Sequence, residues 1–330
     1  MKRAITLLGS LSLLLIIASA IFIVINRVPD RPVEALTARW AQPPSQFVEI
    51  NGLKIHLRDE GPRNDPTPIL LLHGTSSSLH TWNGWSKELN EQRRVIRFDM
   101  PGFGLTGPSP DNVYTIERYA QTVIAVLDQL NIERSVLAGN SLGGYVAWAT
   151  ALFYPERVEQ LVLVDASGYP FKAESIPIGF RIANTPILNT LMEDVMPRSM
   201  VKSSLENVYG NPTLVTSELV DRYFDLMTRS GNRKALVERF RQTQPGQLAD
   251  RVPELKQPTL ILWGKLDRLI PPDNADRFHQ DISGSTLVLF EDLGHVPQEE
   301  DPVATVSALK RFLSTPKTIA LPPPEQPASQ

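Results

Sequence analysis

Cysteine is absent from this chain of 330 residues. Its absence excludes disulfides, thiolate metal sites and a cysteine nucleophile. An excess of basic charge is absent too, because 33 lysine and arginine residues against 36 aspartate and glutamate residues give a formal net charge of −3. Proteins that bind nucleic acid usually carry a basic surface, so we expect no nucleic-acid partner.

The sequence also has no recognisable metal or dinucleotide motif. Its five histidines form no His-x-x-x-His pair or equivalent cluster. The Gly-Phe-Gly sequence at residues 102–104 lacks the third glycine of a dinucleotide fingerprint. We therefore expect neither a metal nor a cofactor.

One long apolar run is present, at residues 4–25, and it carries no charge. As a helix rising about 1.5 Å per residue it would be about 33 Å long, enough to cross a hydrocarbon layer of about 30 Å. Residues 1–28 are therefore predicted to be a transmembrane anchor. Lys2 and Arg3 precede the run, and Arg27 and Arg31 follow it with Asp30 between them. This slight bias favours a single-pass protein whose main domain is periplasmic or extracellular.

A cleaved signal peptide is the alternative for this segment. Ala18-Ser19-Ala20 resembles a cleavage site, but a signal peptide has an apolar region of only about 7–15 residues. Residues 21–25 prolong the apolar run beyond that site, which favours an uncleaved anchor.

The remaining chain shows alternating strand and helix patterns. Asn51-Gly52 lies between two strand-like runs and is a strong hairpin signal. From Ile116 to Leu130 apolar residues recur every three or four positions, as on a helix packed against a sheet. Further strand-like runs are at residues 69–72, 95–98, 135–138, 161–164, 259–263 and 286–290. This alternation predicts an α/β fold with a mostly parallel sheet and helices on both faces.

Between the sixth strand and the next, the alternation stops. This stretch contains amphipathic helical patterns interrupted by prolines, and we interpret it as an inserted helical cap that supplies an apolar pocket. The predicted units are an anchor (1–28), a linker (29–45), the first part of the core (46–165), the cap (166–255), the second part of the core (256–314) and a proline-rich disordered tail (315–330).

The most informative motif is Gly-Asn-Ser-Leu-Gly at residues 139–143. It lies between a predicted strand and a predicted helix, where a serine flanked by glycines occupies a tight turn with its hydroxyl clear of the sheet. Ser141 is therefore the candidate nucleophile. Asp267 and His295 each follow a later predicted strand. A serine, then an acid, then a histidine along the chain is one of the known orders of a catalytic triad.

With these motifs the chain resembles the α/β-hydrolase superfamily over about residues 47–313. Further marks of the resemblance are Leu71-Leu72-His73-Gly74, the turn at residues 99–104 and Asp301-Pro302. The resemblance implies that His295 is the general base and that Asp267 orients it. Asp165 also ends a strand and stays open as the acid.

The oxyanion of the reaction needs two donors. The backbone N–H of Leu142 is predicted as one and that of Thr75 as the other, with Ser76 as its alternative. His73 is expected to hold this loop by hydrogen bonds. His80 has two interpretations, a pocket residue or a residue of a surface turn.

These features predict a membrane-anchored serine hydrolase that cleaves apolar carboxylic esters, of short-to-medium acyl or monoacylglycerol type. Anchored monoacylglycerol lipases are similar in layout. The alternative is hydrolysis of a carbon–carbon bond, because residues 139–144 and 218–223 look similar to meta-cleavage-product hydrolases. A non-catalytic relative that binds a ligand is the third hypothesis.

Overall fold

The computed structural model describes residues 2–186, 188–191 and 193–314, with the backbone alone for residues 2–9, 11 and 191. Its strands form one eight-stranded sheet of order β1-β2-β4-β3-β5-β6-β7-β8. Strand β2 pairs antiparallel with both β1 and β4, and the strands from β4 to β8 in this order pair parallel. The strands are β1 (Gln46–Ile50), β2 (Leu53–Glu60), β3 (Ile69–Leu72), β4 (Val95–Phe98), β5 (Ser135–Asn140), β6 (Val158–Val164), β7 (Thr259–Gly264) and β8 (Thr286–Phe290).

Helices cover both faces of the sheet because successive side chains of a buried strand point to opposite faces. In β3, Leu70 and Leu72 pack in the same hydrophobic cluster as α4 (Ile116–Gln129), α5 (Leu142–Phe153) and α11 (Asp273–Asp281). Ile69 and Leu71 pack in a second cluster, with α3 (Asn83–Leu89) and α13 (Pro302–Ser314). The predicted α/β fold is therefore confirmed.

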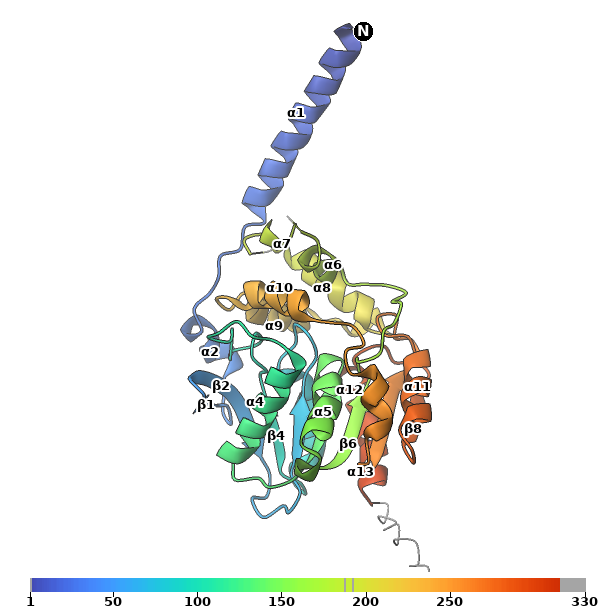
Figure 1. Cartoon of the computed structure of the whole chain (residues 1–330). Helices are drawn as coiled ribbons and strands as arrows, with labels where there is room; N and C mark the ends of the chain where they lie inside the picture. The colour runs from blue at the N-terminus through green and yellow to red at the C-terminus, as the bar shows by residue number, and fades with distance from the viewer. Residues whose placement is uncertain (1, 187, 192, 315–330) are drawn as a thin grey trace, which may run out of the picture.

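The segment between β6 and β7 is helical, and Figure 1 shows it beyond the carboxyl ends of the parallel strands. It has a hydrophobic cluster of its own, built on residues such as Val201, Leu205 and Val220, which also includes Val296 of the core. The helices are α6 (Ile178–Ala183), α7 (Leu188–Leu191), α8 (Arg198–Val208), α9 (Ser217–Met227) and α10 (Asn232–Gln242). The bounds 166–255 for a separate cap stay a prediction.

The predicted linker at residues 29–45 contains a short helix, α2 (Glu34–Trp40). Leu36 and Trp40 are buried and pack with Leu105 and Leu226. The chain just before it also lies against the cap segment, since the N–H of Val28 donates to Asp194 O at 2.8 Å. This part of the chain is thus bound to the domain rather than a free spacer.

The first helix, α1 (Lys2–Ile25), extends away from the domain beside the cap, as Figure 1 shows. Among the residues whose side chains the structure describes, no helix is both long enough and apolar enough to cross a membrane. The anchor at residues 1–28 stays a prediction. The predicted tail at 315–330 lies outside the described residues.

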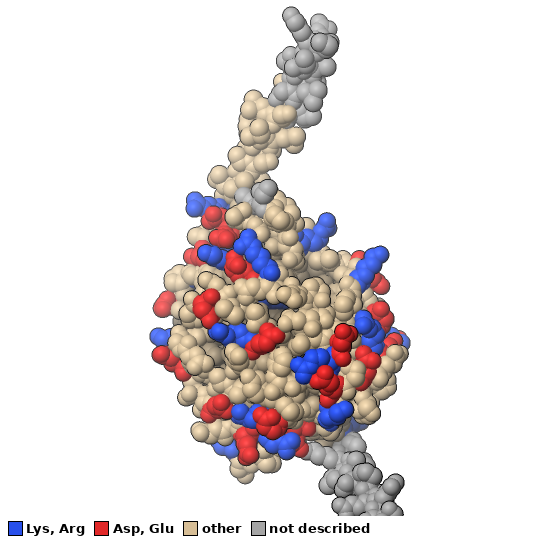
Figure 2. Space-filling view, in the orientation of Figure 1, with Lys and Arg blue, Asp and Glu red and all other residues tan. Residues whose placement is uncertain are grey.

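Short elements complete the described chain. They are the 3₁₀ helices at Leu79–Trp82, Pro155–Arg157, Pro212–Leu214 and Ala249–Glu254, and the helix α12 (Pro297–Glu300). The face of the molecule in Figure 2 carries basic and acidic side chains next to one another.

Candidate active site

Ser141 lies on the turn that joins β5 to α5. Its backbone has φ 55° and ψ −117°, a conformation that costs a residue with a side chain about 1–3 kcal/mol. Hydrogen bonds hold it there: Ser141 N–H donates to Val164 O at 3.0 Å, and Tyr145 N–H donates to Ser141 O at 3.1 Å. The strain is therefore imposed by the strand and the helix on either side.

The two glycines around Ser141 are required by close packing of backbone. A Cβ atom on Gly139 would lie 2.1 Å from Gly143 O, and one on Gly143 would lie 2.1 Å from Leu72 O. No side chain fits at such distances. The Gly-x-Ser-x-Gly pattern in the sequence thus reflects helix α5 starting directly against β5 and β3.

Asp267 and His295 meet at the carboxyl ends of β7 and β8. His295 Nδ1 lies 2.7 Å from Asp267 Oδ2, and both side chains are buried. The other carboxylate oxygen, Oδ1, accepts the N–H groups of Leu269 at 2.8 Å and Ile270 at 3.0 Å. The carboxylate is therefore fixed on both oxygens, and it holds the imidazole by Nδ1.

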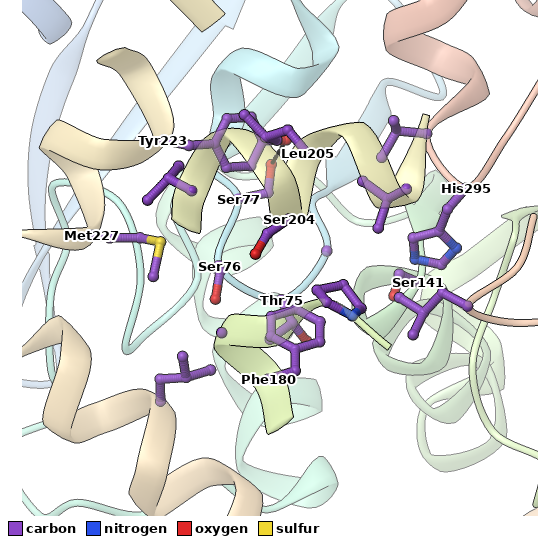
Figure 3. A pocket seen from close by; sticks show the side chains of 18 of the residues that line it. Thr75, Ser76, Ser77, Ser141, Phe180, Ser204, Leu205, Tyr223, Met227 and His295 are labelled. Carbon is purple, nitrogen blue, oxygen red and sulfur yellow. Dashed lines mark hydrogen bonds between the residues drawn. The ribbon is translucent and has the colours of Figure 1, made fainter. Parts of the chain in front are cut away.

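His295 and Ser141 line one pocket. Figure 3 shows the imidazole ring of His295 next to the Ser141 side chain, with Thr75 among the other labelled residues of the pocket. Because Nδ1 is occupied by Asp267, Nε2 is the ring nitrogen left to accept a proton from the serine. This arrangement is the one that a serine nucleophile and its base need.

Asp165, the other candidate acid, lies directly beside this pair. Its Oδ1 accepts the N–H of Gly264 at 3.0 Å, whereas Oδ2 has no hydrogen-bond partner among the described residues. Burial, and after it the negative charge of Asp267, raises the pKa of Asp165 well above its ordinary value. Burial and the neighbouring charge thus disfavour a second negative charge beside Asp267.

Asp165, Asp267 and His295 also form a possible metal site. Among the described residues they are the one set that could offer a metal three ligands, with ligand atoms within 4.8 Å of one another. Two ligands of a tetrahedral zinc, each about 2 Å from the ion, would be about 3.3 Å apart. The 2.7 Å separation of His295 and Asp267 is that of a direct hydrogen bond, which leaves no room for an ion between them.

The predicted oxyanion donors lie close to Ser141 in the chain or in space. A Cβ on Gly74 would lie 3.2 Å from Ser141 Cβ, so the loop that carries Thr75 passes close over the serine. In the described part of the chain, neither Thr75 N–H nor Leu142 N–H has a hydrogen-bond partner. Both groups are therefore available to a ligand, although their role stays a prediction.

His73 holds this loop, as the sequence indicated. Its Nδ1 donates to Gly74 O at 2.8 Å and its Nε2 accepts the N–H of Met100 at 2.9 Å. Burial lowers the pKa of His73, which fits a neutral ring with one donor and one acceptor. His80 is buried, with Nε2 2.9 Å from Trp40 O, so it does not lie in a surface turn. It lines neither cavity at Ser141 but borders a separate one.

No sequence pattern indicated how closely the cap is joined to the loop that carries His295. His295 N–H donates to Val208 O at 2.8 Å, at the end of α8. Arg222 on α9 donates to both carboxylate oxygens of Glu299, at 2.7 and 2.8 Å. Asn140 Nδ2 donates to His295 O at 2.9 Å from the other side. These contacts join segments more than 75 residues apart, for which the sequence holds no local pattern.

Two cavities reach Ser141. The smaller, of about 80 Å³, is lined by apolar cap residues, among them Phe180, Val201 and Leu205. The larger, of about 520 Å³, lies between Ser141 and the C-terminal part of α10. Thr75 and Leu269 line both. Ser141 therefore borders both cavities.

Comparison with known proteins agrees with this geometry. The model of a family described as "Alpha/beta hydrolase family" matches residues 69–309. The chain belongs to this family.

Three of its relatives are informative about function. The chain is 30% identical to a 2-hydroxy-6-oxo-2,4-heptadienoate hydrolase of Pseudomonas putida, over 82% of this chain and 96% of the relative. A meta-cleavage product hydrolase from Pseudomonas fluorescens is similar in structure, with TM-score 0.69 and 26% identity over 81% of this chain and 97% of that one. A membrane phospholipase A has TM-score 0.71 and 26% identity over 95% of this chain and 98% of that one.

The different positions of Asp267 and Asp165 predict different effects of their substitution. Asp267→Asn is expected to lower kcat by about 10⁴, because an amide cannot stabilise the imidazolium as a carboxylate does. Asp165→Asn is expected to keep kcat within about tenfold, since the amide oxygen of asparagine can accept the N–H of Gly264 as Asp165 does, and the contact between Asp267 and His295 is untouched. The measurement is kcat of the two purified variants on p-nitrophenyl butyrate. An Asp165→Asn variant as inactive as Asp267→Asn would contradict the assignment.

Proposed function

We propose that this hydrolase acts through a catalytic triad of Ser141, His295 and Asp267, with the backbone N–H groups of Thr75 and Leu142 as the oxyanion donors. The observation that carries the proposal is the buried 2.7 Å contact between His295 and Asp267 in the pocket that also contains Ser141. The positive φ of Ser141 supports it, because strained serines of this kind present the hydroxyl to a substrate.

The reaction follows from these positions. Ser141 Oγ bonds to the carbonyl carbon of the substrate while its proton passes to His295 Nε2, and Asp267 stabilises the imidazolium. The bond to the leaving group then breaks, and the leaving group takes the proton from His295. Water attacks the acyl-serine with His295 again as the base, which releases an acid and restores the serine.

The names of the relatives favour a carbon–carbon bond as the one that breaks. A compound such as 2-hydroxy-6-oxo-2,4-heptadienoate contains a ketone for Ser141 to attack. For its carbon–carbon bond to break, the enol proton must first move to C5, which gives the 2,6-dioxo tautomer. Cleavage of C5–C6 then leaves the electron pair on C5, conjugated through the C3–C4 double bond with the 2-oxo group, and the oxygen of that group takes the proton from His295. We therefore place hydrolysis of a vinylogous diketone first, ahead of the ester hydrolysis that the sequence alone favoured.

Ester hydrolysis is the second candidate, and two observations favour it. The smaller cavity at Ser141 has an apolar lining without a charged side chain among the described residues, which suits an acyl chain. The similarity to a membrane phospholipase A extends over 95% of this chain. Each methylene buried in that cavity would contribute about 0.8 kcal/mol, so short-to-medium acyl groups are the expected esters.

Kinetics on both substrate classes test this order. We expect kcat/KM on 2-hydroxy-6-oxo-2,4-heptadienoate to exceed that on the best p-nitrophenyl ester, from acetate to octanoate, by about tenfold or more, which is ~1.4 kcal/mol of transition-state binding. Loss of the dienol absorbance and release of p-nitrophenol are the two readouts. The opposite order would identify an esterase.

Variants of two serines test the mechanism itself. Ser141→Ala is expected to lower both activities by up to about 10⁶, whereas Ser204→Ala, at a serine on α8 that lines the same pocket, is expected to keep them. Near-normal turnover by a folded Ser141→Ala variant would exclude a serine hydrolase.

Attachment to a membrane through α1 is a further part of the proposal. The large apolar side chains of α1 between Leu13 and Ile25 are 36–74% exposed, and lipid would remove them from water. Figure 2 shows no acidic or basic side chain along the described part of this helix. Because residues 26–31 are bonded to the cap, for example Asp30 to Arg233 at 2.7 Å, an anchor here would hold the cap close to the lipid.

Fractionation tests the attachment. The full chain is expected to stay with membranes after a high-salt wash and to keep its N-terminal residues, whereas a chain of residues 26–330 is expected to be soluble and active. Mass spectrometry of the isolated protein gives the mature N-terminus. A soluble mature form that begins at Ile21 would show a cleaved signal peptide instead.

A further inference from the structure

Helix α10 carries an arginine in an unusual setting. Arg239 is only 7% exposed, and it lines the larger of the two cavities that reach Ser141. Its one hydrogen bond among the described residues is a long one, 3.5 Å from Nη1 to Thr243 Oγ1, and its Nε has none. No described carboxylate forms an ion pair with it.

Other buried arginines show what is missing. Arg97 is bonded to Glu60 at 2.7 Å, and Arg233 is bonded to Asp30 at 2.7 Å. Arg222 donates to both oxygens of Glu299, so it too is occupied, and neither cavity at Ser141 includes it. Of these four arginines, Arg239 is the one that lines a cavity reaching Ser141 and has no ion-pair partner among the described residues.

The surroundings do not neutralise Arg239 either. Burial lowers its pKa, but a guanidinium stays protonated in proteins. The one titratable group whose charge would act on Arg239 is Tyr119. Burial raises the pKa of Tyr119, so its phenol is neutral near pH 7. Of the described residues that line the cavity, Arg239 is the one that carries a charge. An unpaired buried charge is costly, and an anion in the cavity would remove that cost.

We propose that Arg239 binds an anionic group of the substrate, a carboxylate or a phosphate, while the uncharged acyl part occupies the smaller apolar cavity. This inference rests on the proposed function, because it takes Ser141 as the point of attack between the two cavities. A guanidinium recognises both anions through paired N–H donors. The anion then sets which side of the scissile bond becomes the leaving group.

Matched substrates test the proposal. The anionic ones are 4-butyryloxybenzoate and 4-butyryloxyphenyl phosphate, and the neutral one of similar shape is 4-butyryloxybenzamide. Arg239→Met is expected to lower kcat/KM on the preferred anion by about 10- to 100-fold, the usual range for a lost charged hydrogen bond, and to change the neutral substrate by less than about threefold. Arg239→Lys is expected to recover part of the loss. The anion that loses more identifies carboxylate or phosphate.

Controls separate this role from a structural one. Arg241→Met removes an arginine of the same helix that is 59% exposed and paired with Glu238, and it is expected to leave all three substrates unchanged. Equal loss on anionic and neutral substrates by a folded Arg239→Met variant would show a structural role and overturn the proposal, as would no loss at all.

A binding measurement keeps the proposal testable if Ser141 does not hydrolyse these compounds. Calorimetry of Ser141→Ala with 4-hydroxybenzoate or phenyl phosphate is expected to show binding that Arg239→Met in the same background weakens about tenfold or more. Unchanged affinity would overturn the anion site even if hydrolysis is confirmed, and weakened affinity would support it even if hydrolysis fails.

Discussion

The structure depends on the close approach of three backbone segments around Ser141. Gly139 and Gly143 let β5, β3 and the start of α5 come within distances that exclude any Cβ, and this contact forces the positive φ of the serine between them. The hydroxyl and the N–H groups at the start of α5 then face one space beyond the sheet. Asp267 and His295 reach that space because parallel strands end at the same edge.

The cap belongs to this arrangement rather than lying over it as a separate lid. The bond from His295 N–H to Val208 O and the ion pair between Arg222 and Glu299 tie α8 and α9 to the loop that carries the histidine. Tyr223 of α9 also contacts Ser77 of the oxyanion loop at 3.1 Å, a contact visible in Figure 3. A displacement of these helices would therefore disturb His295 and the loop of residues 74–77 together, which carry the proposed base and one proposed oxyanion donor.

The sequence predicted what repeats at short range or follows from strand order. Hydrophobic periodicity gave the sheet and its helices, and the glycines around Ser141 gave the turn. It left Asp165 and Asp267 open as the acid, since both end neighbouring strands; only the side-chain geometry shows that Asp267 contacts His295 while Asp165 lies behind it. The ion pair of Arg222 with Glu299 and the lack of a described ion-pair partner for Arg239 depend on residues distant in the chain. No local sequence pattern predicts either.

The central claim is that Ser141 is a nucleophile activated by His295. Covalent labelling by a fluorophosphonate, read by mass spectrometry of the peptides, tests it directly without knowledge of the substrate. We expect the adduct on Ser141 alone, lost in Ser141→Ala and formed at least about 10³ times more slowly in His295→Gln, because an unassisted hydroxyl is a weak nucleophile. Labelling of another residue, or an unchanged rate without His295, would contradict the account.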